Sequence, residues 1–400
     1  MFRRINLALF AAGFATFSLL YYVQPLMPEF SREYGVSAAA SALSLSLTTG
    51  ALAFGLLLAG GVSDRWGRKR VMVVSLLSSA ALVLLTALVT QWPLFLVLRV
   101  LLGLTLSGVP AVAMTYLSEE IHTESIGLGM GLYISGSAVG GMSGRLMAGV
   151  LADLLGWRLG VAVIGAIDLC AGFAFWYALP ASRHFTPKPL HWRRWAAHFS
   201  GIWSDPGLPW LFAEGFLLLG TFVTVYNYLA YRLMASPYDF SQTAVGLLFS
   251  VYVIGIVSSP WMGHLAGRLG RRKVLWAMFA LILMGVLLTF FSSLWLILPG
   301  ITALTFGFFG GHSIASSWVG RRAGEAKAQA SSLYLFAYYM GSSIAGAAGG
   351  LLYAAYGWNG IVEFVGALAF MGLMIAWRLY RLTPLKPPTP ELLARHEAIP

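Results

Sequence analysis

The sequence predicts an all-α membrane protein with twelve transmembrane helices, arranged as two pseudo-symmetric bundles of six. Three observations predict this fold: the composition, the spacing of apolar runs, and repetition between the two halves. Of the 400 residues, 58% are hydrophobic and only 10% are charged, whereas about 25% of the residues of a soluble domain are charged. A helix that crosses a bilayer needs about 20 mainly apolar residues, so a chain of this length can hold about a dozen.

Apolar runs separated by helix breakers define the expected spans. The first resembles a secretory signal, but it continues to Met27 without a clear small-x-small cleavage site, so we expect a retained span. The longest connection, 181–208, separates a bundle at 1–180 from a bundle at 209–382, and a tail follows at 383–400. In chain order the spans are expected near 6–27, 40–62, 71–90, 93–115, 127–152, 158–180, 209–234, 241–263, 273–293, 295–318, 328–353 and 360–380.

The distribution of Lys and Arg predicts the orientation. Twenty-one of the 26 fall at the termini or in connections on one side, against Arg32, Arg158 and Arg232 on the other. The positive-inside rule therefore predicts that both termini are cytoplasmic. The net charge of +11 is then an orientation signal and does not indicate nucleic-acid binding. The single cysteine, Cys170, excludes an internal disulfide and a cysteine-built metal site.

The two halves are similar in sequence. "GVLADLLGW" at 149–157 returns as "GLLYAAYGW" at 350–358, a shift of 201, and "GGVSDRWGRKRV" at 60–71 returns as "GHLAGRLGRRKV" at 263–274, a shift of 203. Duplicated bundles predict a binding site where the halves meet near the middle of the membrane. At these shifts three residue pairs also match: Tyr133 with Tyr334, Gly140 with Gly341, and Gln24 with Asn227.

The connection between the second and third spans carries a specific motif. Its residues G60-x3-D64-R65-x-G67-R68-K69 match the signature G-x3-D-R-x-G-R-R/K, so the chain resembles the major facilitator superfamily. Segments such as "MTYLSEEIH" and "GLYISGSAVGGMSGR" look like a group of bacterial inner-membrane transporters placed near the drug–proton antiporters. The resemblance implies secondary transport by rocking of two bundles, with the proton gradient as energy source and no bound cofactor.

Residues of this motif are candidates for a latch between the bundles: Gly60, Asp64, Arg65, Gly67 and Arg68. Asp64 follows the C-terminal end of a helix, where the helix dipole disfavours an anion, so it needs a positive partner. Arg68 or a helix N-terminus of the other half could serve; the resemblance implies the second.

Two further segments bear on the latch. In the second copy of the motif, Gly267 replaces the acid before Arg268, which predicts a weaker latch there. Glu119 and Glu120 are expected in a cytoplasmic loop, either paired with the basic loops as part of an inner gate or simply solvated. A plain solvated loop that only sets topology also remains open for the motif itself.

Charged residues inside the spans are candidates for proton coupling. Arg99 resembles the superfamily's buried arginine that is linked to proton coupling, although it lies only six residues after Pro93 and could reach the outer interface. Burial favours the neutral form of a carboxyl group, so Glu214, Asp168 and Glu363 are candidate proton carriers. Glu214 is favoured because span 7 is central in the superfamily, whereas span 6, with Asp168, is peripheral.

The fifth span contains an embedded arginine within a glycine pattern. The antiporters to which the chain is similar have G-x3-G-P-x2-G-G here; this chain keeps Gly136, Gly140 and Gly144, has Gly141 for the proline and Arg145 for the last glycine. The glycines predict close packing on a neighbouring helix. Arg145 could pair with an acid, bind an anionic or hydroxyl-rich solute, or extend past the following Asp to the outer surface.

Polar and aromatic residues in spans 1, 5, 7 and 11 are candidates for the substrate cavity, because the resemblance implies that these spans face it. Tyrosine also marks membrane interfaces, which is the alternative for Tyr21, Tyr22 and Tyr231. The predicted cavity residues are Gln24, Tyr133, Arg145, Tyr226, Asn227, Tyr334 and Tyr338.

No catalytic motif is found in the sequence. A P-loop and an HExxH pattern are absent, so we expect neither ATP hydrolysis nor metalloenzyme chemistry. The leading hypothesis is proton-coupled efflux of small organic compounds by a multi-pass inner-membrane monomer, with protons, solute and lipid as partners. Sugar or organic-anion transport with Arg145 contacting the solute is the alternative, and a non-transporting receptor is a third possibility.

Overall fold

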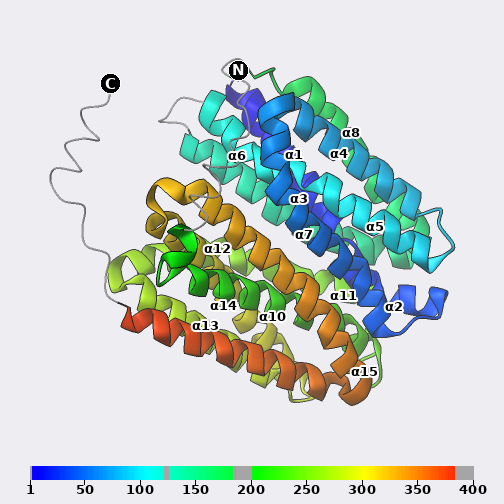
Figure 1. Cartoon of the computed structure of the whole chain (residues 1–400). Helices are drawn as coiled ribbons and strands as arrows, with labels where there is room; N and C mark the ends of the chain where they lie inside the picture. Colours follow the sequence, from blue (N-terminus) through cyan, green and yellow to red (C-terminus); the bar gives the residue numbers. More distant parts are fainter. Residues whose placement is uncertain (1, 121–125, 183–184, 186–200, 383–400) are drawn as a thin grey trace.

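The structure is a computed structural model that describes residues 2–120, 126–182, 185 and 201–382 (Figure 1). Most of the predicted connection 181–208 and the whole tail 383–400 lie outside the described residues. The N-terminal half contains α1 (Phe2–Tyr21), α2 (Val23–Tyr34), α3 (Ala38–Trp66), α4 (Arg68–Thr86), α5 (Trp92–Leu106), α6 (Gly108–Glu120), α7 (Ile126–Leu155) and α8 (Trp157–Ala178). The C-terminal half contains α10 (Leu208–Met234), α11 (Gln242–Leu248), η2 (Phe249–Val251), α12 (Tyr252–Leu269), α13 (Arg271–Leu288), α14 (Leu294–Arg322), η3 (Gly324–Ala326) and α15 (Lys327–Arg381).

These helices form the twelve predicted spans. Ten stretches of the described chain are long and apolar enough to cross a membrane. One of them, α15, crosses twice because it breaks at Gly357. Another span, α13, begins with three basic residues but has 18 residues in all, which is enough for about 27 Å of helix. The predicted all-α fold is thereby confirmed.

The first span is longer than the sequence predicted. Its apolar run ends at Met27, but the helix resumes as α2 and continues to Tyr34, where Gly35 ends it with a left-handed conformation. Pro25 occupies the first turn of α2, where a missing N–H costs nothing. The polar end of α2 therefore extends beyond the apolar core and reaches the other half of the molecule.

The turns between helices show the internal repeat directly. Gly67 and Gly270, which a shift of 203 relates, have φ of 93° and 94°; Gly156 and Gly357, which a shift of 201 relates, have φ of 78° and 61°. Positive φ of this kind favours glycine because other residues would place a Cβ against the backbone. Equivalent positions in the two halves thus make equivalent sharp turns.

Helix packing repeats in the same way. Gly140 on α7 lies against Phe14 of α1, where an added Cβ would come 2.1 Å from the Phe14 carbonyl oxygen. Its counterpart Gly341 on α15 lies against Phe216 of α10, with a corresponding distance of 2.0 Å. Each half is therefore built around the same close helix pair.

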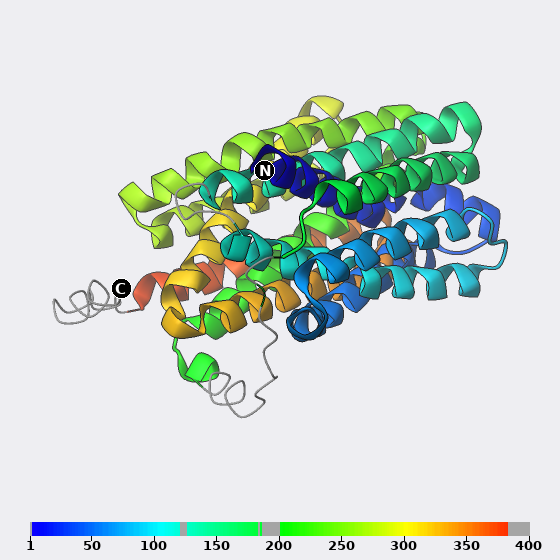
Figure 2. The same ribbon diagram turned by 90° about the horizontal axis from the view of Figure 1, so that it is seen from above.

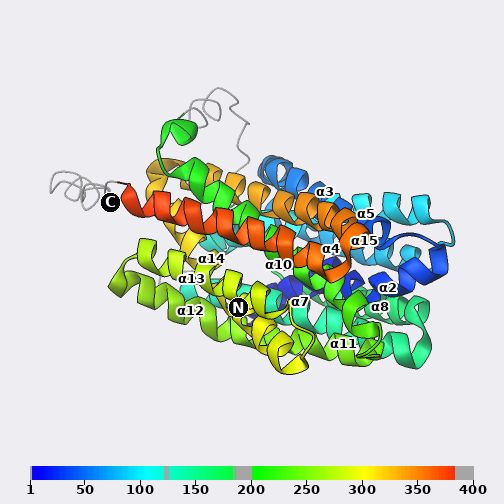
Figure 3. The same cartoon turned by 90° about the horizontal axis from the view of Figure 1, so that it is seen from below.

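The halves meet along three helix pairs. The first part of α15 runs beside α3 (Figure 3), α11 lies beside α7 (Figures 2 and 3), and α2 contacts α10. The start of α1 and the end of α15 lie at the same end of the bundle (Figure 1). We call this the inner end, which also contains the turns at Gly67 and Gly270; the turns at Gly156 and Gly357 lie at the outer end.

Candidate functional site

A buried arginine lies between the two halves. Arg145 of α7 is 1% exposed; its Nε donates to Oε1 of Gln24 at 2.5 Å and its Nη1 to the carbonyl of Gly141 at 2.5 Å. None of the acids that the structure describes pairs with it. Ring faces attract a cation, and three rings surround the guanidinium: Tyr21 at 4.0 Å, Tyr252 at 4.8 Å and Phe249 at 5.1 Å.

The partner of Arg145 also joins the halves. Nε2 of Gln24 donates to Oδ1 of Asn227 at 2.8 Å, and both side chains are fully buried. Since the two positions are equivalent in the repeat, this bond lies at the pseudo-twofold axis. Arg145 requires the amide oxygen of Gln24, so the NH₂ group of Gln24 must face Asn227. Nδ2 of Asn227 is buried without a hydrogen-bond partner.

Tyr226 completes this group from the C-terminal half. Its hydroxyl pairs with that of Thr305 at 2.8 Å, and its ring stacks on Phe249 at 5.1 Å between centroids. Gln24, Arg145, Tyr226 and Asn227, four of the seven predicted cavity residues, are therefore brought together.

The other predicted cavity residues lie beside this group or farther from it. Tyr334 forms a second group with His312, whose Nδ1 lies 3.0 Å from the Tyr334 hydroxyl. Tyr338 lies between the two groups, within electrostatic range of both Arg145 and Tyr334. The ring centroid of Tyr338 lies 4.4 Å from that of His312, with the two planes tilted by 34°. Tyr133 packs in a separate core cluster of the N-terminal half, and its buried hydroxyl has no partner.

Glu214 is a fully buried acid of the inner half of α10. Neither carboxyl oxygen has a hydrogen-bond partner. The next residue, Gly215, leaves room for the ring of Tyr334, which an added Cβ would approach to 2.7 Å, and Glu214 lies within electrostatic range of Tyr334. The acid thus lies in the core near Tyr334.

The two other acids differ in burial. Asp168 on α8 is fully buried with neither oxygen hydrogen-bonded, and Ser18 of α1 is the polar side chain that acts on it. It therefore faces the interior of the N-terminal half and not lipid. Glu363, in contrast, is exposed. Asp168 and Glu214 belong to different halves, and no hydrogen bond joins their carboxyl groups.

Arg99 connects three helices. It is fully buried; Nε donates to the carbonyl of Ser44 on α3 at 2.6 Å and Nη2 to that of Leu20 on α1 at 3.1 Å. Its guanidinium also lies 5.3 Å from the ring centre of Tyr22. The side chain neither extends to the outer interface nor pairs with an acid that the structure describes.

The glycines of the fifth span contact α1. An added Cβ at Gly136, Gly140 or Gly144 would come within 2.1 to 2.7 Å of the α1 backbone. Gly141 faces the guanidinium instead, 3.3 Å from Nη1 of Arg145. The pattern therefore sets the separation between α7, which carries Arg145, and α1, which leads directly into the helix of Gln24.

The predicted latch residues form a network within one half. Asp64 pairs with Nη1 of Arg68 at 2.5 Å, and Glu119 accepts two hydrogen bonds from Arg68 at 2.8 and 3.1 Å. Asp64 thus takes the nearer of its two possible partners. Glu120 ends α6 nearby and is half-buried. Two residues of the motif and its second copy, Arg65 and Arg268, are exposed, and Gly60 and Gly267 have open space beside them.

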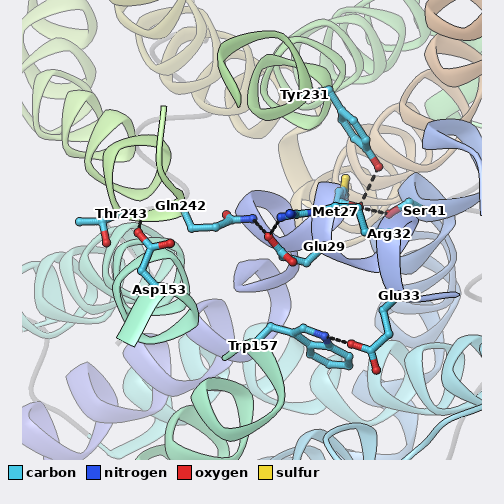
Figure 4. A network of polar contacts seen from close by, with 10 residues as sticks. All are labelled: Met27, Glu29, Arg32, Glu33, Ser41, Asp153, Trp157, Tyr231, Gln242 and Thr243. Carbon is cyan, nitrogen blue, oxygen red and sulfur yellow. Dashed lines mark hydrogen bonds and ion pairs between the residues drawn. The ribbon is translucent and has the colours of Figure 1, made fainter. Parts of the chain in front are cut away.

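Hydrogen bonds between the halves gather toward the outer end (Figure 4). Gln242 donates to Glu29 at 2.9 Å, the backbone N–H of Thr243 to Asp153 at 2.7 Å, and Tyr231 to the carbonyl of Met27 at 2.8 Å. A Ser31–Tyr231 contact and the Gln24–Asn227 bond also cross between the halves. The structure is therefore closed at its outer end.

Comparison with known proteins identifies the family. The sequence matches the Major Facilitator Superfamily over residues 9–234 and 211–399. The chain belongs to the major facilitator superfamily. It is therefore a multi-pass membrane transporter of the secondary type, and the resemblance found in the sequence motifs is confirmed.

Relatives of this superfamily member cover nearly its whole length. The inner membrane transport protein YnfM of Escherichia coli is 52% identical over 95% of this chain and 91% of its own length. The uncharacterized MFS-type transporter YybF of Bacillus subtilis is 46% identical over 94% of this chain and 93% of its own length. A crystal structure of the nucleoside transporter NupG has the same fold, with a TM-score of 0.76, 14% identity, and coverage of 94% of this chain and all of that one.

Several residues of the site were not predicted. Phe249 and Tyr252, which face Arg145, come from the eighth span, and aromatic residues are too common in this chain to single them out. No sequence pattern singled out Gln242 or Glu29. Asp153 was noted only as a neighbour of Arg145, although its spacing from Gly149 and Gly156 is the same as that of Asp64 from Gly60 and Gly67.

Proposed function

We propose that this chain is a proton-coupled transporter of the bacterial inner membrane that exports small organic compounds by alternating access. Two bundles, 1–180 and 209–382, rock about the site between them, joined by the connection 181–208. The basic inner end faces the cytoplasm together with both termini and the tail 383–400. The transporter acts as a monomer in the lipid bilayer.

The uneven distribution of inter-half bonds supports alternating access. Hydrogen bonds cross between the halves at the outer end and at the Gln24–Asn227 position. At the inner end Asp64, Arg68 and Glu119 bond only to their own half. The arrangement corresponds to an inward-facing state, and the opposite state requires the outer bonds to break.

Proton coupling is supported by one observation above all: the carboxyl group of Glu214 is buried with both oxygens unpaired. A buried carboxylate without a partner is costly, so the group binds a proton until the site opens to water. Tyr334 lies within electrostatic range of Glu214, and His312, which contacts the Tyr334 hydroxyl, can accept and return that proton through it. Asp168 is the second candidate proton carrier. Arg99, which pairs with no acid that the structure describes, tunes proton coupling from the N-terminal half.

Proton movement in proteoliposomes tests this proposal. With a pH-sensitive dye inside, adding ethidium should move protons in the direction opposite to the cation. We expect Glu214→Gln to abolish this signal and Asp168→Asn to reduce it less. The exposed Glu363→Gln is the matched control and should behave as the unaltered protein. Equal proton movement in Glu214→Gln and Glu363→Gln would exclude Glu214 as the carrier.

A second candidate function, transport of organic anions or sugars, is favoured by the surroundings of Arg145. Its charge is not neutralised by any described acid, and Nη2 donates to none of the described residues while Nε and Nη1 are in use. A free edge of the guanidinium between aromatic rings suits a carboxylate on a planar body. We expect Arg145→Gln to lower the rate of benzoate-driven exchange at least tenfold more than the rate of ethidium-driven exchange. An equal loss of both rates would mean that Arg145 is structural.

A further inference from the structure

The spacing of the inner motif recurs at the outer end of the same half. Gly60, Asp64 and Gly67 follow the pattern G-x3-D-x2-G, and so do Gly149, Asp153 and Gly156 at the end of α7. The C-terminal half has the same spacing at 263, 267 and 270 and at 350, 354 and 357, with Gly267 and Ala354 in place of the acids. All four turns end in a glycine with positive φ. Four equivalent turns thus exist, two at each end, and only the N-terminal half carries acids in them.

The first glycine of each turn reports which end is closed. An added Cβ on Gly149 would come 2.4 Å from the Gln242 carbonyl oxygen, and one on Gly350 would come 2.4 Å from Cα of Ala39; both contacts cross to the other half. At the inner end, Gly60 has nothing within 4 Å. Gly263 meets only Ser313, at 3.5 Å and in its own half. The outer pair of turns is packed across the interface and the inner pair is not.

Asp153 occupies the N-terminus of a helix of the opposite half (Figure 4). Its Oδ2 accepts a hydrogen bond from the backbone N–H of Thr243 at 2.7 Å. The Ser241 side chain and the backbone N–H of Gln242 also hydrogen-bond to the Asp153 carboxylate. The span that begins there continues to Leu269. Free N–H groups and the helix dipole favour an anion at this place, so the contact holds α7 and α11 together.

The corresponding place at the inner end has no side-chain cap. The helix N-terminus that faces the inner end from the C-terminal half is that of α15, where the N-cap Ala326 makes no side-chain hydrogen bond. Asp64, the acid equivalent to Asp153, is held by Arg68 instead. One acid is therefore engaged across the interface while its counterpart is not.

We infer that Asp153 is an outer latch, and that it alternates with Asp64 during transport. In the inward-facing state Asp153 caps α11 and holds the outer end closed. In the outward-facing state Asp153 leaves α11, Gly60 packs against the other half, and Asp64 caps α15. Asp153 is a positioning residue because it acts through a helix terminus and touches no solute. The inference rests on alternating access, but not on proton coupling or on the identity of the solute.

Distances between spin labels test the latch without any solute. The labels are attached to cysteines introduced at Leu88 and Trp295, which are exposed at the outer ends of opposite halves. The exposed Cys170 is first replaced by serine so that only these two positions react. We expect Asp153→Asn to raise the ratio of outer-open to outer-closed molecules about 5- to 30-fold, the effect of losing one charged helix cap. Glu33→Gln is the matched control: Glu33 is an acid of the same end that bonds Trp157 and Arg158 within its own half.

Two further variants separate a latch from a merely structural acid. Thr243→Pro removes the donated N–H but is tolerated in the first turn of a helix, and should act like Asp153→Asn even where the latter does not fold. Asp64→Asn should shift the ratio the opposite way, and the double variant Asp64→Asn with Asp153→Asn should return close to the original ratio. If Asp153→Asn and Thr243→Pro both match Glu33→Gln, or if the double variant stays as open as Asp153→Asn, the inference is wrong.

Discussion

Replacement of Gly140 by alanine should force apart the helix pair on which the site is built. The new Cβ would lie 2.1 Å from the carbonyl oxygen of Phe14 and 2.5 Å from its Cα, whereas ordinary contacts begin at 3.4 Å. Because the atoms it meets belong to the backbone of α1, no side chain can rotate away. The helices must separate by about 1 Å or more, which corresponds to the overpacking of a full core.

The magnitude follows from two opposing terms. Overpacking costs about 1 to 3 kcal/mol, and removal of a glycine from a helix interior returns about 0.5 to 1 kcal/mol. The expected net loss is about 0 to 2.5 kcal/mol of the free energy of unfolding. A shift of this size in α7 would also stretch the 2.5 Å bond from Arg145 to Gln24 toward about 3.5 Å, beyond useful hydrogen-bond length. Solute exchange should therefore fall together with stability.

Thermal unfolding in detergent, followed by tryptophan fluorescence, measures the effect. Each kcal/mol corresponds to about 2 to 4 °C for a bundle of this size. Gly131→Ala on the same helix is the matched control, because it has nothing within 4 Å and should be neutral or slightly stabilising. Gly341→Ala, the counterpart in the other half, should behave like Gly140→Ala. If Gly140→Ala unfolds at or above the temperature of Gly131→Ala, the packing argument is refuted.

Two more substitutions test the turns and the pseudo-twofold bond. Gly270→Ala should lower the free energy of unfolding by about 1 to 2 kcal/mol, because its φ of 94° is strained for alanine. Gly267→Ala, in a helix, should be neutral, and thermal unfolding of the two variants compares them. Gln24→Leu leaves both Arg145 and Asn227 without their partner, and should destabilise by about 2 to 4 kcal/mol, clearly more than Asn227→Leu, which leaves only the Gln24 amide unpaired. The reverse order in a denaturation series would contradict the assigned orientation of the Gln24 amide.

Much of the fold could be predicted because it depends on local composition and on repetition. The twelve spans follow from apolar length, and the turns at Gly67 and Gly270 follow from a motif that occurs twice. The matching shift of Gln24 and Asn227 marked two equivalent positions. That they touch one another follows only from the placement of both residues on the pseudo-twofold axis, which requires the structure.

The remainder depends on contacts between halves and on conformational state. Arg145 was expected either to find an acid or a solute or to reach the surface, but its surroundings come mainly from Tyr252 and Phe249, and no periodicity tells which face of span 8 meets span 5. Asp64 had two possible partners, and which one it takes depends on whether the inner end is open. The extension of α2 was missed because its polar residues contact the other half beyond the apolar core.

The most direct test of the central claim is accumulation of a labelled solute in proteoliposomes under an imposed pH gradient. Radiolabelled ethidium and benzoate can be compared, with and without a protonophore. The proposed mechanism predicts that at least one of them accumulates against its own gradient only while the pH gradient lasts, and that Glu214→Gln equilibrates it without accumulation. Accumulation that is unaffected by the protonophore, or that is preserved in Glu214→Gln, would contradict proton-coupled transport through this site.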